Sequence, residues 1–113
     1  MSVTYLNRKF QLWEYRVSHG SLLVRSPKGH DTTTNVDLVF DGVEYICCPR
    51  MLRGVELVAA TAEDIQRVRQ HVGEVREPDR LFVLVSDGAR HFIVASSCRI
   101  DEHTADIFNS PFA

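Results

Sequence analysis

Apolar residues recur along the chain mainly with the two-residue period of β-strands, and short turns separate three pairs of such runs. The first pair predicts a hairpin over residues 9–26, with His19 and Gly20 as the turn, because glycine adopts a positive φ at little cost. Phe10 and Leu12 are out of phase with the later apolar positions, so we expect a bulge near Leu12 or burial of both faces there. A two-residue loop gives three pairs on one largely apolar face and one charged pair on the other: Val17 with Leu22, Tyr15 with Val24, Trp13 with Ser26, and Glu14 with Arg25.

The second pair predicts a hairpin over residues 35–48 around Asp41 and Gly42, a dipeptide typical of type I′ turns that places Gly42 at positive φ. A one-residue slip would mix the apolar and polar faces, which favours this register over its neighbours. The register predicts that Cys47 is buried and that Cys48, on the opposite face, is more accessible. The pairs on the apolar face are Phe40 with Val43, Leu38 with Tyr45, and Val36 with Cys47.

The third pair predicts a hairpin over residues 81–97 around Asp87 and Gly88. Residues 81–85 and 92–95 are continuous apolar runs, which are typical of strands covered on both faces. We therefore expect both strands to lie in the middle of the sheet. The pattern allows a loop of two, three or four residues.

Residues 61–72, between the second and third hairpins, have the pattern of a helix. Thr61 is a good N-cap, Glu63 and Asp64 fall in the first turn, and Gly73 can end the helix. The apolar stripe that would face the sheet consists of Ile65, Val68 and Val72.

The remaining segments complete an α+β fold. Pro49 ends the strand before it, and residues 54–60 read as a further strand. After Cys98 the chain becomes polar, and we expect a short segment near the end to dock on the body as one helical turn through Ile107, Phe108 and Phe112. The fold class predicted is a mostly antiparallel curved sheet or partly open barrel of about seven strands, in three hairpins, with one helix. Residues 1–113 form a single β-rich domain, without internal repeats or a linker.

Composition places the chain among ordinary globular domains. Apolar residues make up 44% and charged residues 25%, with a net charge of −2. No basic excess favours nucleic acid or an anionic membrane as a partner, and no apolar run reaches the ~18 residues of a membrane span. The start of the chain does not resemble a secretory signal, and three cysteines are an odd number. We therefore expect free thiols and a cytoplasmic location.

Candidate metal ligands lack a recognised spacing. Cys47 and Cys48 are adjacent on a predicted strand, so their side chains point to opposite faces and do not chelate one ion. His91, Cys98 and His103 are at spacings that no common zinc site uses. We expect no metal and no cofactor, and we expect that folding does not depend on metal.

Catalytic chemistry has one candidate location. His19, His30 and Asp31 lie in or near turns, and three threonines follow Asp31 at positions 32–34, so a hydroxyl nucleophile beside a His–Asp pair is conceivable there. The same residues are typical of a solvated loop whose side chains bond to their own backbone. The sequence contains none of the common nucleophile, phosphate-loop or zinc-protease motifs. We therefore expect a protein that is not an enzyme.

The densest basic features outside the helix are the Lys28–Gly29 pair and the segment from Arg50 to Arg53, either of which can receive a phosphate or an acidic partner. The segment consists of Arg50, Met51, Leu52 and Arg53, and arginine and methionine are both enriched at interfaces. We predict that these four residues form a loop that contacts a partner protein. The alternative is that Met51 and Leu52 plug one end of the barrel.

Three stretches of the chain resemble a family of short bacterial proteins. They are residues 9–27, residues 36–45 and residues 52–57, and the resemblance extends over most of the chain. The family implies no activity, cofactor or site residue.

Two functions remain open from the sequence. The first is a non-enzymatic protein-binding domain, with the neutralisation of a toxin as one such role, because the chain is compact, slightly acidic and without catalytic motifs. The alternative is a small-ligand-binding β-domain with a pocket at the mouth of the sheet. In that case Arg16, Arg25 or Arg50 would anchor an anionic group. A hydrolase or transferase using His19, His30 or Asp31 ranks third.

Overall fold

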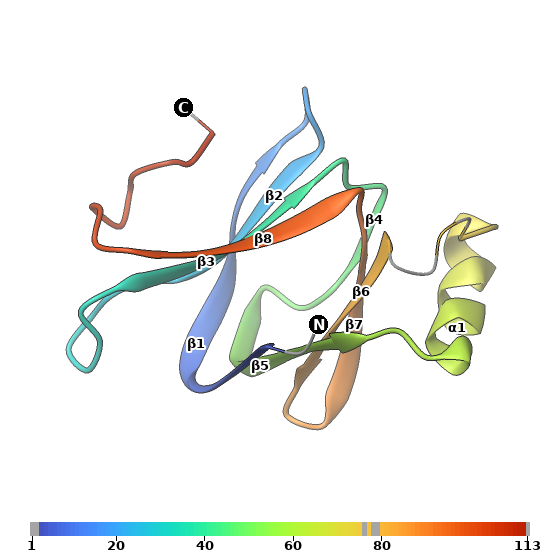
Figure 1. The fold of residues 1–113 in the computed structure, drawn as a ribbon, viewed down its shortest axis with the longest axis horizontal. Helices are drawn as coiled ribbons and strands as arrows, with labels where there is room; N and C mark the ends of the chain where they lie inside the picture. Colours follow the sequence, from blue (N-terminus) through green and yellow to red (C-terminus); the bar gives the residue numbers. More distant parts are fainter. Residues whose placement is uncertain (1–2, 76, 78–79, 113) are drawn as a thin grey trace.

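The computed structural model describes residues 3–75, 77 and 80–112, and these residues form one sheet of antiparallel strands with one helix (Figure 1). The sheet has eight strands in the order β4-β7-β6-β5-β1-β2-β3-β8 and is not closed. The predicted α+β curved sheet is confirmed, with β8 as a strand that the sequence pattern did not reveal. The elements are β1 (Val3–Arg16), β2 (Ser21–Ser26), β3 (Asn35–Asp41), β4 (Tyr45–Cys47), β5 (Met51–Ala59), α1 (Ala62–Val72), β6 (Leu81–Ser86), β7 (Ala89–Val94) and β8 (Ser97–His103). In the described ranges no helix is long and apolar enough to cross a membrane.

The sheet bends so that its two halves enclose the main core. β1 is long enough to belong to both halves, because its first part pairs with β5 and its later part with β2. Phe10 and Phe40 from one half pack in one cluster with Leu84 and Ile93 from the other. Gly54 makes this bend of β1 possible, since it has a φ of +69° and lies against the backbone of Leu6.

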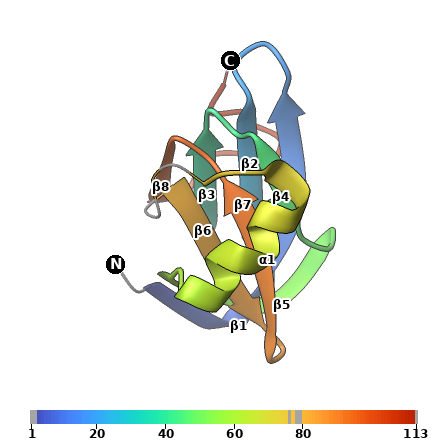
Figure 2. The ribbon, with the colours of Figure 1, turned by 90° about the vertical axis from the view of Figure 1, so that its right-hand side faces the viewer.

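The helix covers the outer face of one half, over β6 and β7 (Figure 2). Val68 is 1% exposed and packs there with Leu81, Val83, Phe92 and Val94. The predicted helix is confirmed, including the Thr61 cap and the end at Gly73.

The second predicted hairpin is wrong, because β3 pairs with β2 and β8, whereas β4 pairs with β7. The chain does not reverse at Asp41 and Gly42 but turns a corner from one half of the sheet to the other. Ser96 turns the same corner on the opposing strand, and its N–H donates to Asp41 O at 2.9 Å. Gly42 does have the expected positive φ, +63°, although no hairpin turn forms there, and a Cβ at this position would lie 2.4 Å from Ser96 Oγ. Glycine is therefore required both by the backbone conformation and by the close approach of Ser96.

The register of the first hairpin also differs from the prediction. Residues 17–20 make a four-residue connection, so Tyr15 pairs with Leu22 rather than with Val24. The same four-residue connection pairs Glu14 with Leu23 instead of Arg25. The bulge expected near Leu12 is present, between Leu12 and Glu14, and it shifts the pairs that lie before it in β1 by one residue.

The third hairpin is confirmed with a two-residue loop, since Ser86 pairs with Ala89. β6 lies between β5 and β7, as expected of a central strand. β5 begins at Met51, three residues before the strand predicted from residue 54.

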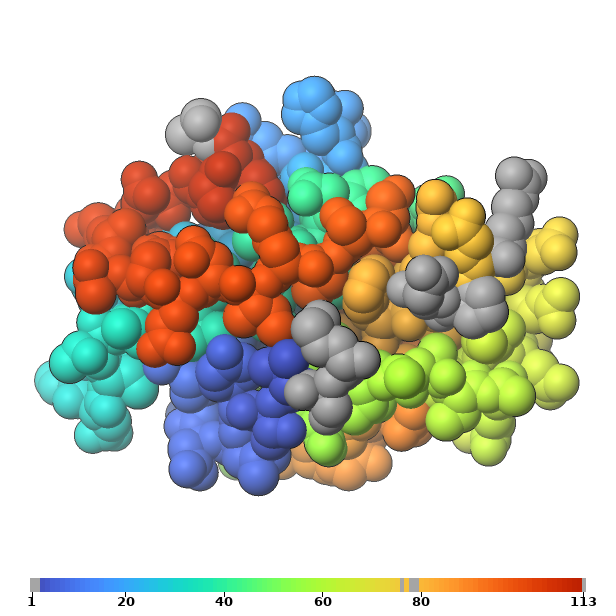
Figure 3. Space-filling view, in the orientation of Figure 1, coloured from blue at the N-terminus to red at the C-terminus, as the bar shows by residue number. Residues whose placement is uncertain are grey.

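Residues 104–112, here called the C-terminal segment, dock on the outer face of the other half of the sheet. The segment forms turns rather than the expected helical turn, and it lies against the surface beside β8 (Figure 3). Ile107 and Phe112 are partly buried, whereas Phe108 is 79% exposed and does not take part in docking.

Candidate functional site

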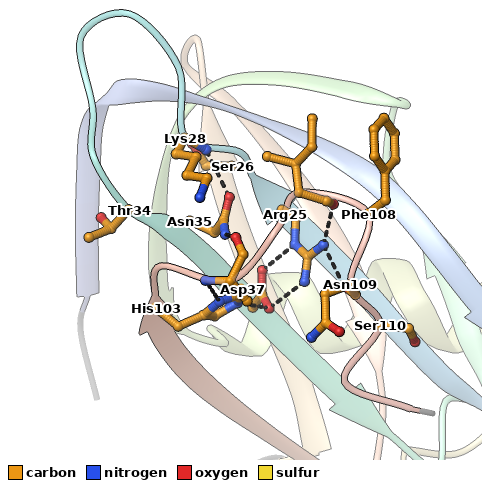
Figure 4. A network of polar contacts seen from close by, with 12 residues as sticks. Arg25, Ser26, Lys28, Thr34, Asn35, Asp37, His103, Phe108, Asn109 and Ser110 are labelled. Carbon is orange, nitrogen blue, oxygen red and sulfur yellow. Dashed lines mark hydrogen bonds and ion pairs between the residues drawn. The ribbon is translucent and has the colours of Figure 1, made fainter.

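A buried polar network holds the C-terminal segment on the sheet (Figure 4). Arg25 is completely buried and forms two hydrogen bonds to Asp37, at 2.7 and 2.9 Å. Its Nη1 also donates to the backbone oxygens of Ile107 and Asn109, at 2.7 and 2.9 Å. The Trp13 ring lies 5.7 Å from the guanidinium carbon. The charge of Arg25 is therefore fully engaged by the protein itself.

His103 completes this network without offering a free base. Its Nε2 lies 2.7 Å from Asp37 Oδ2, and its Nδ1 accepts the N–H of Ala105 at 3.2 Å. Burial alone would raise the pKa of Asp37, but hydrogen bonds from Arg25 and His103 bring it below the usual value. Because both ring nitrogens of His103 are occupied, the cluster is suited to holding structure and not to proton transfer.

The residues considered for catalysis are not brought together. His19 lies in the exposed connection between β1 and β2, whereas His30 and Asp31 lie in the exposed connection between β2 and β3. These connections are at opposite ends of β2. The anchors expected for an anionic ligand are also separate, because Arg25 is buried in the network and Arg16 pairs with Glu14.

The candidate metal ligands do not converge either. Among the described residues, no three His, Cys, Asp or Glu side chains are placed to hold an ion. His91 lies on β7, where burial lowers its pKa, and Cys98 and His103 lie at opposite ends of β8.

The accessibilities predicted for the two adjacent cysteines are wrong. Cys47 is exposed, whereas Cys48 packs against the main core. The reason is that β4 pairs with β7 and not with β3, which turns Cys47 away from the core. Burial raises the pKa of Cys48, and also that of Cys98, to about 12.

Cys47 borders a cavity of about 340 Å³ between α1 and β4. Its walls are mostly apolar and include Val68 and Phe92. The rings of Tyr45 and His71 stack at its edge, with centroids 5.9 Å apart and an interplanar angle of 11°. This cavity, rather than the mouth of the sheet, is the place where a small apolar ligand would fit.

Of the four residues predicted to contact a partner, Met51, Leu52 and Arg53 lie at the start of β5 rather than in a loop. Arg50 precedes the strand, and its backbone oxygen accepts the N–H of Leu12 in β1. Met51 and Arg53 are exposed, whereas Leu52 is 3% exposed and belongs to the main core. Because Leu52 is anchored in the core, it holds this part of β5 in place and fixes the positions of Met51 and Arg53 on the surface.

The ladder between β5 and β1 adds a residue that the sequence did not single out. Lys9 lies directly opposite Arg53, and Gln11 directly opposite Met51. We call the outward side chains of Lys9, Gln11, Met51 and Arg53, together with Arg50 at their margin, the β1–β5 face. The alternation of outward Lys9 and inward Phe10 marks Lys9 as a surface residue, but its partner can be identified only once strand order is known.

Two positive charges that face each other across a ladder repel and destabilise the pairing, and a nearby carboxylate would relieve this repulsion. Within the described part of the chain, no ion pair joins Lys9, Arg50 or Arg53 to a carboxylate. Five of the eight other arginines in the described ranges do have such partners, whereas Arg8, Arg69 and Arg99 do not. The pairs are Arg16 with Glu14, Arg25 with Asp37, Arg67 with Glu63, Arg80 with Glu77, and Arg90 with Asp64. The β1–β5 face thus concentrates uncompensated positive charge on a protein whose net charge is −2.

Comparison with known proteins gives no match: no family model, no curated protein and no solved structure is similar to this chain.

Proposed function

We propose that this protein is a non-enzymatic binding domain that recognises an acidic partner protein through the β1–β5 face. The observation that supports this proposal is the opposition of Lys9 and Arg53 across the ladder, with neither of them in an ion pair among the described residues. A partner carboxylate placed between the two would relieve their repulsion and form charge-assisted hydrogen bonds. Neutralising a toxin by covering its surface is a role of this kind, and it needs no catalytic group on this chain.

The apolar part of the face supports the same function. Met51 is 45% exposed and lies between Arg50 and Arg53 in the sequence. A flexible thioether adapts to a partner's surface, and flanking arginines are frequent anchors of binding energy. The strand underneath is rigid because Leu52 is held in the core, so little order has to be gained on binding.

A pull-down from native lysate with a charge-matched control tests this function. The variant carries Arg50→Ala and Arg53→Ala, and the control carries Arg69→Ala and Arg99→Ala, two exposed arginines on α1 and β8. Both variants lose two positive charges. We expect the wild type and the control to capture the same acidic proteins, which salt releases, and the Arg50/Arg53 variant to bind them about tenfold more weakly, if each arginine contributes ~0.7 kcal/mol.

Equal capture by the Arg50/Arg53 variant would refute the role of this face. Equal loss in both variants would show a general charge effect and would also refute it. The melting temperature of each variant is measured alongside, because surface substitutions normally change stability by about 0.5 kcal/mol or less.

A second candidate, the binding of a small apolar ligand, is favoured by the cavity between α1 and β4. The exposed thiol of Cys47 provides its test, since an occupant would shield that thiol from alkylation. Protein purified directly from cells should then label more slowly at Cys47 than protein refolded from denaturant. Equal rates would remove this candidate.

A further inference from the structure

A second basic feature adjoins the β1–β5 face. An open hollow of about 400 Å³ lies between β1 and the connection that follows β2. Its lining includes Arg8 and Lys9 from β1, with Lys28 and His30 from the connection. Asp31 is the acidic residue of the lining. Lys9 belongs both to this hollow and to the β1–β5 face, so the two features form one continuous basic surface.

The chain contains only two lysines, Lys9 and Lys28, and both line this hollow. All the other permanent cations are arginines. An ammonium group is a compact charge on a flexible stem and accepts a carboxylate from several directions. The hollow therefore holds all the lysine side chains of the protein.

Hydrogen bonds to neutral groups fix the walls of the hollow without neutralising its positive charge. Arg8 Nε donates to Ser26 Oγ at 2.9 Å, and its Nη2 donates to the backbone oxygens of Ser26 and Thr34. These bonds leave Nη1 of Arg8 for another acceptor.

The connection between β2 and β3 is also held in place by hydrogen bonds. The backbone N–H of Lys28 donates to Asn35 Oδ1 at 2.9 Å (Figure 4). Lys28 Nζ donates to Thr104 O, also at 2.9 Å. Thr34 Oγ1 donates to Glu102 Oε2 at 2.7 Å. An ammonium has three donors, so Lys28 keeps two N–H groups for a ligand. A preformed site of this kind loses little conformational entropy on binding.

We infer that this hollow receives an acidic side chain of the partner protein, as a second anchor beside the β1–β5 face. This inference rests on the proposed function and adds a position to it. Arg8 Nη1, Lys9 and Lys28 surround the carboxylate, while Arg50 and Arg53 bind a neighbouring acidic residue. The partner thus presents at least two acidic residues, spaced to span β1.

The test uses a hexaglutamate peptide labelled with fluorescein, titrated into the full chain at low salt and followed by fluorescence anisotropy. Lys28→Gln removes a charge from the hollow only, and its amide can still donate to Thr104 O. Arg69→Gln, on the exposed side of α1, is the matched control. We expect roughly three- to fivefold weaker binding for Lys28→Gln and no change for Arg69→Gln.

A second measurement observes the two lysines of the wild type directly. Reductive methylation with ¹³C-formaldehyde labels both lysines, as well as the α-amino group, and retains their charge. We expect both lysine signals to shift when hexaglutamate is added and to return when salt is raised. The Lys28→Gln variant assigns the two signals.

The outcomes separate the hollow from the wider proposal. If the Arg50/Arg53 variant loses hexaglutamate binding while Lys28→Gln binds normally and the Lys28 signal does not move, the hollow is not a site and the proposed function stands. If Lys28→Gln weakens binding and the Lys28 signal shifts, the hollow is an anchor. If the wild type does not bind hexaglutamate at low salt, the hollow is refuted, and capture of acidic proteins alone decides the function of the face.

Discussion

Arg25 and Asp37 lie directly opposite each other in the β2–β3 ladder and form a bidentate ion pair that is closed off from solvent. The pair is buried because the C-terminal segment lies over it and supplies the oxygens of Ile107 and Asn109. A buried charge that loses its partner is costly, because the remaining charge cannot be solvated. This pair therefore connects the stability of the sheet to the position of the segment.

Arg25→Met should lower the free energy of unfolding by about 3–5 kcal/mol, since it leaves Asp37 without its main partner and two backbone oxygens without donors. Urea unfolding followed by circular dichroism measures this loss. Arg99→Met is the control, because Arg99 is exposed on β8, and it should change stability by about 0.5 kcal/mol or less. A loss below about 1 kcal/mol for Arg25→Met would show that the network does not hold the fold.

Asp64 should make the stability of the helix region dependent on pH. Hydrogen bonds from Arg90, at 2.6 and 2.8 Å, are the main reason that the pKa of Asp64 falls from 3.8 to about 2. A lowered folded-state pKa stabilises the protein above the unfolded value, and this contribution is lost as the pH falls through the folded value. Asp64→Asn should therefore be less stable than the wild type by about 1–2 kcal/mol at pH 7, a figure reduced because the Arg90 side chain is 36% exposed.

The difference between wild type and Asp64→Asn should stay constant above about pH 4 and close between pH 4 and pH 2. Thermal unfolding of both proteins across this range measures it. A difference that persists unchanged at pH 2 would mean that Asp64 is not held ionised by Arg90.

Cys47 should be the most reactive thiol of the protein. It is exposed, whereas the pKa values of Cys48 and Cys98 are raised to about 12 by burial, and only the thiolate reacts. Three variants that each retain one cysteine, with alanine at the other two positions, are labelled with iodoacetamide at pH 8. We expect Cys47 to react at least about 100-fold faster than the others. Faster labelling of Cys48 would contradict the pairing of β4 with β7.

Gly54→Ala should destabilise the protein more than Gly88→Ala. Both glycines have positive φ, +69° and +75°, so the cost of the backbone conformation is similar. A Cβ at residue 54 would lie 2.8 Å from the backbone oxygen of Leu6, whereas a Cβ at residue 88 has no neighbour within 4 Å. We expect losses of about 1 kcal/mol at Gly88 and about 2–4 kcal/mol at Gly54, measured by urea unfolding. Equal losses would show that β1 moves freely at Leu6.

The sequence predicted correctly those elements that depend on contacts between residues close together in the chain. Thr61 and Gly73 bound the helix because caps act within one turn, and the hairpin around Asp87 forms because its strands are adjacent in sequence. Asp41 and Gly42 carry the same type of turn signal, yet the chain continues past them around a corner. A glycine at positive φ serves either purpose, so only the contact with Ser96 distinguishes them.

The candidate site was predictable in part for the same reason. Arg50, Met51 and Arg53 were recognised from composition, since arginine next to an exposed apolar residue is typical of interfaces. The opposition of Lys9 and Arg53 is a contact between residues far apart in the sequence and depends on which strands are neighbours. The same holds for Arg25, which the sequence paired with Glu14 but which the ladder places opposite Asp37.

The hydrogen bonds from Arg25 to the backbone oxygens of residues 107 and 109 join segments that are synthesised far apart in time. β2, which carries Arg25, leaves the ribosome before β8 and the segment, so its guanidinium has no acceptors from the segment until residues 107 and 109 have been made. β8, the outer neighbour of β3, also follows β3 by more than fifty residues. The nascent chain therefore carries an incomplete sheet with an open edge at β3 until β8 emerges, and this half of the protein completes its folding only after residue 109 has emerged from the exit tunnel.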